Sequence, residues 1–193
     1  IKAILASDRV SPDVSAQALH EFSYFGVALG ANTLFEGIRR LEPGHWLRLN
    51  ERECEIRPYW RTEDVVIVDD DLETSTGKTR GLLEAAVKRQ LVSDVPVGVF
   101  LSGGIDSSAV TAFASRHYGG TISTYSVGFD FDKGVNELPK ARRVAEHFST
   151  DHHELHIEGR DMPLVMEELV RCHDEPFSDS GNIPLYLLCR ELN

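Results

Sequence analysis

The chain has 193 residues, of which 41% are hydrophobic, and this length suits one large or two small globular domains. Its net charge of -11, from 20 basic and 31 acidic residues, argues against a nucleic-acid-binding surface, which requires a basic face. The sequence holds no run of about 18 apolar residues and therefore predicts no membrane-spanning helix. Its opening residues lack the basic, apolar and small-residue regions of a signal peptide, so we expect a cytoplasmic protein.

The first 60 residues predict a strand-like start, a helix and a hairpin. The helix is expected over residues 15–29, where apolar side chains recur at helical spacing. Two short strands, 46–49 and 54–57, flank a polar turn at residues 50–53 and would form the hairpin. This part of the chain is therefore expected to be α+β.

Beyond an acidic run at residues 69–71, which suits the N-terminal dipole of a helix, strands alternate with helices. The predicted strands are a buried one at 95–101 and two more at 122–127 and 151–157. The predicted helices are an amphipathic one through Leu82, Leu83, Ala86, Val87 and Leu91, and others at 107–118, 137–148, 162–172 and 183–192. This alternation is typical of an α/β fold with a parallel sheet and flanking helices, which binds ligands at the carboxyl ends of its strands.

The sharpest signal is a glycine- and serine-rich loop at the end of the first predicted parallel strand. Two glycines allow a tight turn and a close approach of the backbone to a ligand. The helix that follows directs free amides and the positive end of its dipole at the same point, and serine hydroxyls add donors. We therefore predict a pyrophosphate site made by Ser102, Gly103, Gly104, Asp106, Ser107 and Ser108.

Asp106 is unexpected beside phosphates, because a carboxylate and a phosphate repel each other. Its presence is explained if a cation lies between them, and we predict that Asp106 helps to hold Mg²⁺, directly or through water. The alternative is that Asp106 only caps the N-terminus of the following helix.

Residues 76–79, Thr-Gly-Lys-Thr, are similar to the end of a Walker A phosphate loop. That motif requires glycine five residues before Gly77, where this chain has Leu72, and no apolar strand precedes it. We therefore interpret these residues as a helix-entry segment.

The combination of SGG, Asp106 and two serines between a buried strand and an amphipathic helix resembles the pyrophosphate loop of the ATP pyrophosphatases, the PP-loop or adenine nucleotide alpha hydrolase-like fold. Further stretches resemble glutamine-hydrolysing asparagine synthetases of the class B type. They are residues 91–98, Asn136-Glu137 with Ala141, Val144 and Ala145, His152-His153-Glu154, residues 174–179 and residues 183–186. Residues 32–38, 41–45 and 59–60 are similar to the last part of a class II glutaminase domain.

The resemblance implies two regions: residues 1–62 as the C-terminal part of a glutaminase domain, and 70–193 as the N-terminal part of the synthetase domain. It implies ATP and Mg²⁺ as cofactors, and aspartate with glutamine or ammonia as substrates. The reaction implied is synthesis of asparagine through a β-aspartyl-AMP intermediate, with release of AMP and pyrophosphate. The family also suggests a homodimer. Because the family's N-terminal cysteine nucleophile and second synthetase loop are not seen, we expect an inactive fragment; Cys54 lies in the hairpin and is no candidate.

The resemblance also assigns residues around the loop. Leu101 and Val127 would flank the adenosine and Gly128 would leave room for it, the alternative being plain core packing. Asp106 and Glu137 are the catalytic candidates, although Glu137 is alternatively an N-terminal helix charge. Glu175 and Asp179 are further candidates for substrate or ammonia handling, and Asp179 alternatively caps the following helix.

Two further hypotheses concern metal and function. On a strand, His152, Glu154 and His156 would share one face and could bind zinc, although an exposed edge or a packed face is the alternative that we favour. The rival functions are another amide-forming enzyme on this scaffold, such as a β-lactam synthetase or an amidotransferase for a sugar or peptide precursor, and a non-catalytic adenine-nucleotide-binding module.

Overall fold

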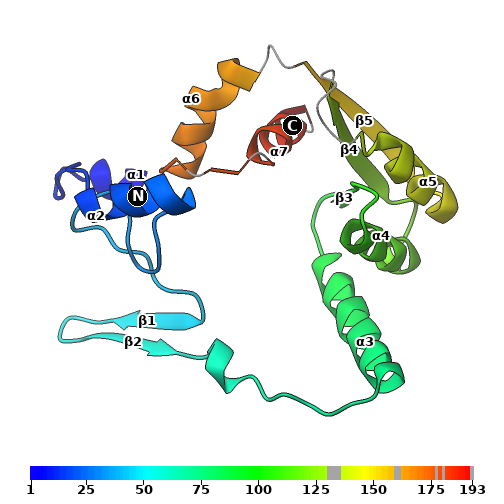
Figure 1. The fold of residues 1–193 in the computed structure, drawn as a ribbon, viewed down its shortest axis with the longest axis horizontal. Coiled ribbons are helices and arrows are strands. Elements are labelled where there is room, and N and C mark those ends of the chain that lie inside the picture. Colours follow the sequence, from blue (N-terminus) through cyan, green and yellow to red (C-terminus); the bar gives the residue numbers. More distant parts are fainter. Residues whose placement is uncertain (130–135, 159–161, 177, 180, 192–193) are drawn as a thin grey trace. The chain divides into compact units, whose positions relative to one another are not determined.

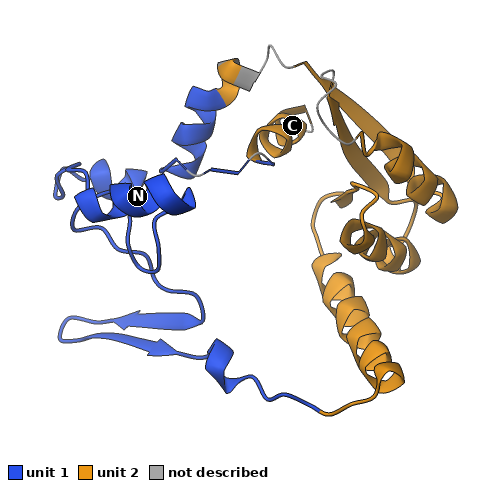
Figure 2. Ribbon diagram, viewed as in Figure 1, with its two compact units in different colours: residues 1–68, 166–181 blue, residues 69–165, 182–193 orange. Residues whose placement is uncertain are grey.

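The computed structural model describes residues 1–129, 136–158, 162–176, 178–179 and 181–191. The chain forms two compact units, residues 1–68 with 166–181 and residues 69–165 with 182–193 (Figure 2). Within the described residues, no helix has the length and apolarity that crossing a membrane requires. Leu192, the expected end of the last helix, lies outside the described residues.

The first unit carries the helices α1 (Lys2–Leu5) and α2 (Ala16–Phe25), the strands β1 (His45–Leu49) and β2 (Cys54–Pro58), and the short 3₁₀ helix η1 (Thr62–Asp64). The strand-like start was a wrong prediction, because residues 2–5 are Lys, Ala, Ile and Leu and form a helical turn, which lysine, alanine and leucine favour. The hairpin is confirmed, since β1 and β2 pair antiparallel (Figure 1).

The helix α2 begins and ends with recognisable caps. The Ser15 hydroxyl accepts a hydrogen bond from the Ala18 N–H at 3.4 Å, and Gly26 ends the helix with a left-handed φ of 71°. Glu21 on α2 then fixes the following loop, because its carboxylate accepts bonds from the Leu29 N–H and the Asn32 Nδ2. The bond from the Leu29 amide is the main reason why the pKa of Glu21 is lowered.

The second unit is an α/β fold with a parallel sheet, as predicted. Its elements are α3 (Leu72–Gln90), β3 (Gly98–Phe100), α4 (Ile105–His117), β4 (Ser123–Phe129), α5 (Leu138–Phe148), β5 (Asp151–Ile157) and α7 (Asn182–Glu191); α6 (Met162–His173) spans the boundary between the units. The strand order is β3-β4-β5, and both neighbouring pairs are parallel (Figure 1).

The first parallel strand is shorter and more exposed than expected. Val95 is 69% exposed and lies outside β3, which begins at Gly98 and pairs only with β4 among the described strands. Pro96 has no backbone N–H with which to pair with a neighbouring strand. An edge strand also has a neighbouring strand on one side only, so the apolar run 95–101 is mostly not buried. Leu101, the residue after β3, is an exception at 1% exposed.

Helices cover the sheet, and among the described residues of this unit two clusters of buried side chains lie where they meet. Val87 from α3 and Phe113 and Ala114 from α4 pack with Ile122, and Leu101 packs with Ala141 and Ala145 from α5. Leu82, expected on the apolar stripe of α3, is instead 73% exposed. The acidic run 69–71 leads into α3 as expected, since Asp71 is its N-cap. Residues 76–79 lie inside α3, past its first turn, so they form part of the helix and not its entry segment.

Candidate functional site

The loop 102–104 turns the chain sharply between Leu101 and α4. Gly103 has a left-handed φ of 74°. A Cβ at Gly103 would lie 2.6 Å from both the backbone nitrogen of Ala141 and the Cβ of Lys140. Gly103 is therefore required for two reasons, its backbone conformation and the close packing of the loop against the first turn of α5.

Hydrogen bonds among the serines hold the loop in shape. The Ser107 hydroxyl accepts a bond from the Ser102 N–H at 3.2 Å and lies 3.0 Å from the Ser102 hydroxyl. The Ser102 hydroxyl in turn accepts from the Gly104 N–H at 3.3 Å. Ser102 is exposed and Ser107 and Ser108 are half-buried, so the loop is accessible to solvent.

The N-terminus of α4 offers free donors at this loop. Gly104 is the N-cap residue and has no side chain with which to cap the first-turn amides, so Ile105, Asp106 and Ser107 present N–H groups that an anion can bind. The alternative for Asp106 as an N-cap is therefore wrong, because Asp106 lies in the first turn.

The surroundings of Asp106 fit a magnesium ion that is shared with a phosphate ligand. Its side chain is exposed, and within the described part of the chain no residue bonds its carboxylate. Mg²⁺ prefers oxygen ligands and is usually bound by one or two carboxylates together with substrate phosphates and water. One exposed carboxylate beside hydroxyls and free amides meets that description.

The residues expected near adenosine lie in three different environments. Leu101 is buried beneath α5, its N–H donates to the Tyr125 carbonyl at 2.8 Å, and its own carbonyl accepts from the Ser126 hydroxyl. Val127 is half-buried within β4, two residues before the last one. The room that Gly128 was expected to leave is taken by Leu138, whose Cδ1 would lie 2.5 Å from a Cβ at Gly128. The side chains of Leu101 and Leu138 therefore serve the core.

Glu137 stands immediately before α5, at its N-cap position, and its side chain is exposed and makes no capping bond. The Glu137 carbonyl accepts bonds from the N–H groups of Lys140 and Ala141, the two residues that Gly103 packs against. The fold thus brings the loop and the segment that carries Glu137 to the same end of the sheet.

A row of basic side chains on α5 was missing from the predicted site. Gly103, Lys140, Arg143 and His147 line an open pocket of about 450 Å³, together with Val144 and Phe148. The three basic residues recur at the spacing of one helical face, and this periodicity is the signal that could have found them. The positive charges of Lys140 and Arg143 beside the loop suit a phosphate ligand.

Comparisons with known proteins now add to this geometry. Residues 78–193 match the family model described as Asparagine synthase, and residues 1–60 match the Glutamine amidotransferase domain. The chain belongs to the asparagine synthase family. This confirms the family that the loop and its flanking motifs indicated.

The relatives of this chain carry names of two kinds, asparagine synthetase and amidase. An "Asparagine synthetase [glutamine-hydrolyzing] 3" from Bacillus subtilis is 34% identical over 100% of this chain and 33% of its own length. An "Amidase chry2" from Gibberella zeae is 32% identical over 93% of this chain and 29% of its own length. The chain therefore spans about a third of the length of these relatives.

Among solved structures, the chain is similar to an NH3-dependent NAD synthetase from Campylobacter jejuni in complex with the nitrate ion. The match covers 63% of this chain and 52% of the chain of that synthetase. Its TM-score of 0.35 and 18% identity are too low to bear on the assignment.

Glu175 and Asp179, two further candidates of the synthase region, make contacts of their own. Glu175 is buried and pairs with Arg40 and the Leu34 N–H within the first unit, so its surroundings are structural. Asp179 is exposed and accepts a bond from the Gly181 N–H at 2.8 Å. Gly181 immediately precedes α7, so this bond lies at the N-terminus of that helix.

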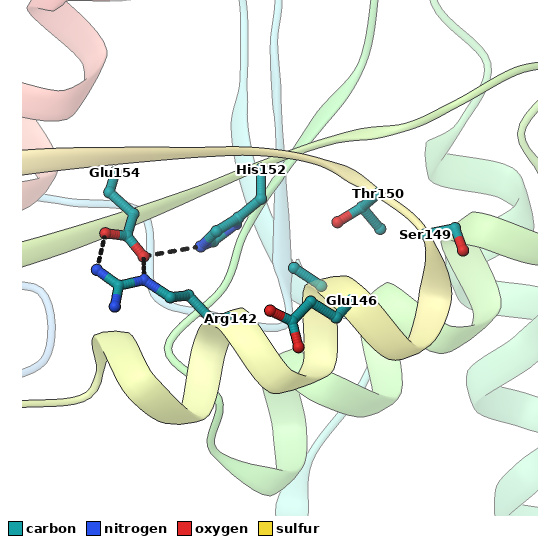
Figure 3. Close-up of a pocket in the computed structure, with 7 residues that line it drawn as sticks. Arg142, Glu146, Ser149, Thr150, His152 and Glu154 are labelled. Atoms are coloured by element: carbon teal, nitrogen blue, oxygen red, sulfur yellow. Dashed lines mark hydrogen bonds and ion pairs between the residues drawn. The ribbon is translucent and has the colours of Figure 1, made fainter.

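On the face of β5 where zinc was considered, an arginine from α5 binds the carboxylate of Glu154 (Figure 3). Arg142 on α5 donates to both carboxylate oxygens of Glu154, at 2.6 Å each, and this holds the pKa of Glu154 below its ordinary value. His152 bonds the Thr124 hydroxyl through Nδ1 at 2.9 Å, and its Nε2 lies 3.5 Å from Glu154. Among the described residues, no three His, Cys, Asp or Glu side chains are arranged for a metal.

Removal of zinc should therefore leave activity intact. We expect the full-length protein, stripped with a chelator and then supplied with Mg²⁺, to recover its full rate of reaction, because Arg142 already neutralises Glu154. The measurement is that rate before and after treatment, with the metal content determined in parallel. Recovery only on addition of zinc would contradict this.

Proposed function

We propose that the full-length protein containing this chain makes asparagine from aspartate and ATP, with ammonia taken from glutamine. The loop between Leu101 and α4 supports this proposal most directly, because it combines free helix amides, hydroxyls and one unpaired carboxylate at the carboxyl end of a parallel strand. That combination suits a nucleotide pyrophosphate.

The proposed roles follow from the geometry. The amides of the first turn of α4 and the hydroxyls of Ser102, Ser107 and Ser108 would bind the β- and γ-phosphates of ATP, which leave together as pyrophosphate. Leu101, Val127 and Gly128 would flank the adenosine through their backbones, since the side chain of Leu101 is buried and Leu138 fills the space at Gly128.

Asp106 would hold Mg²⁺, which supplies neutralisation of the negative charge that grows on the departing pyrophosphate. The chain's own contribution is to hold this carboxylate in the first turn of α4, next to the amides, where no other described residue competes for it. Glu137, exposed at the start of α5, would lie beside the same ligand and act on aspartate or ammonia.

The reaction divides into two displacements. An oxygen of the aspartate side-chain carboxylate attacks the α-phosphorus of ATP, the bond to the β-phosphate breaks, and pyrophosphate leaves. Ammonia then attacks the acyl carbon of β-aspartyl-AMP, loses a proton, and AMP departs with the oxygen that came from aspartate. Positioning of the reactants and neutralisation of charge account for most of the catalysis that such a transfer requires.

A second candidate is another amide-forming enzyme on the same scaffold. The observation that favours it is the fungal relative named an amidase, which is 32% identical and so nearly as similar as the asparagine synthetase at 34%. The two candidates share the loop and differ in the carboxylic acid that receives the nitrogen.

The acceptor is tested with the full-length protein, ATP, Mg²⁺, ammonia and a panel of carboxylic acids. We expect AMP and pyrophosphate only with aspartate, matched by an equal amount of asparagine. Formation of AMP and pyrophosphate with another acid instead would retain the loop assignment and replace the substrate.

A further inference from the structure

Glu175 is a buried carboxylate that the proposed reaction does not use. Its side chain is only 6% exposed. One of its oxygens accepts a hydrogen bond from the Leu34 N–H, and the other forms an ion pair with the Arg40 guanidinium. Both oxygens are thus satisfied, which a carboxylate removed from water requires.

Arg40 is itself fixed by the loop that it closes. Its Nη1 donates to the Ala28 carbonyl at 3.2 Å, and its backbone N–H donates to the Ala31 carbonyl at 2.9 Å. The guanidinium is therefore presented to Glu175 from a loop that is already ordered, so the ion pair needs little further ordering of the chain.

A second contact joins the same two segments. The Ser178 N–H donates to the Gly26 carbonyl at 2.8 Å, and a Cβ at Gly26 would lie 2.6 Å from the Cβ of Ser178. Asp174, which follows α6, adopts a left-handed φ of 68° and turns the chain there. Glu175 and Ser178 are therefore both held against the loop that follows α2.

The two segments belong to different family matches. Gly26, Leu34 and Arg40 lie in the glutamine amidotransferase match, residues 1–60, whereas Glu175 and Ser178 lie in the asparagine synthase match, residues 78–193. The contact therefore links an ammonia-producing region with an ammonia-consuming one, if the proposed function holds. Ammonia that escapes into neutral water becomes ammonium, which has no lone pair for attack on an acyl carbon.

We propose that the Arg40–Glu175 ion pair is a positioning device that couples glutamine hydrolysis to amide formation. It holds the connection between α6 and α7 against the glutaminase region, so that ammonia is delivered and not lost. Both residues act through the segments that they join and touch no substrate. This inference rests on the proposed function and assigns Glu175 a role other than substrate or ammonia handling.

The test uses the full-length protein with the variants Arg40→Met and Glu175→Gln, and with Arg39→Met as the exposed neighbouring control. Glutamate, AMP and amide product are measured with glutamine as nitrogen donor, and amide product again with ammonium. Because couplings between sites are commonly fivefold or more, we expect each pair variant to raise the ratio of glutamate to amide by about fivefold or more, with the ammonium-dependent rate within about twofold of wild type. Arg39→Met should leave the ratio unchanged.

Three results would overturn the proposal. An equal loss with both nitrogen donors would place Glu175 in substrate handling, an unchanged ratio would leave the pair without a coupling role, and loss of folding in both variants would make it a stabilising contact only. If the wild type forms no amide from either donor, the proposed function is itself wrong, and that result is distinct from the other three.

Discussion

Replacement of Asp106 by asparagine is expected to lower the rate of AMP formation by the full-length protein about a hundredfold or more, because one group that neutralises transition-state charge is commonly worth that much. The change keeps the size of the side chain and removes its charge, so Mg²⁺ loses a ligand. Asp106 is exposed and bonds no other described residue, so the fold should be unaffected. The rate and the Mg²⁺ concentration for half-maximal activity should both change.

The matched control is Glu73→Gln. Glu73 is also an exposed acid in the first turn of a helix of the same unit, α3, but lies far along the chain from the loop. Its replacement should leave the rate as in the wild type. Equal rates for Asp106→Asn and Glu73→Gln would show that Asp106 is only a helix-terminal charge.

Replacement of Gly103 by alanine should damage both the fold and the activity. A left-handed φ and a Cβ 2.6 Å from the Ala141 backbone nitrogen mean that the loop or α5 must move. Strain and overpacking of this kind lower the free energy of unfolding by about 1–3 kcal/mol. The free energy of unfolding, from urea titration, and the rate of AMP formation are the two measurements.

Two other glycines separate these effects. At Gly104, φ is -72° and the nearest atom to a new Cβ is the Ser102 hydroxyl at 3.3 Å, so Gly104→Ala should fold normally and lose activity through crowding of the ligand. At Gly119 a Cβ would meet nothing within 4 Å, so Gly119→Ala should change neither property. A Gly103→Ala protein as stable as Gly119→Ala would refute the packing argument.

The sequence predicted the parts of the fold that depend on local pattern. The strand β5 was expected and found at residues 151–157, and α5 was expected at 137–148 and found at 138–148. These segments have clear periodicity and end at recognisable turns. The burial of the strand at 95–101 was wrongly predicted, because its apolar composition does not tell how many strands flank it. Among the described strands, only β4 pairs with it.

The candidate site was predictable where a contiguous motif carried it and not where contacts are long-range. The loop 102–108 combines residues whose roles depend on the next few positions along the chain. The ion pair of Glu175 with Arg40 joins residues 135 positions apart, so no local sequence pattern predicts it. The ion pair between Arg142 and Glu154 likewise depends on how α5 packs on β5.

The central claim is that the loop 102–108 binds the pyrophosphate part of ATP while a carboxylate attacks the α-phosphorus. The most direct test supplies the full-length protein with ATP, Mg²⁺, ammonia and aspartate labelled with oxygen-18 in its side-chain carboxylate. Labelled AMP, unlabelled pyrophosphate and an equal amount of asparagine are the predicted products. ADP together with labelled inorganic phosphate would mean attack at the γ-phosphorus and would contradict the assignment of the loop.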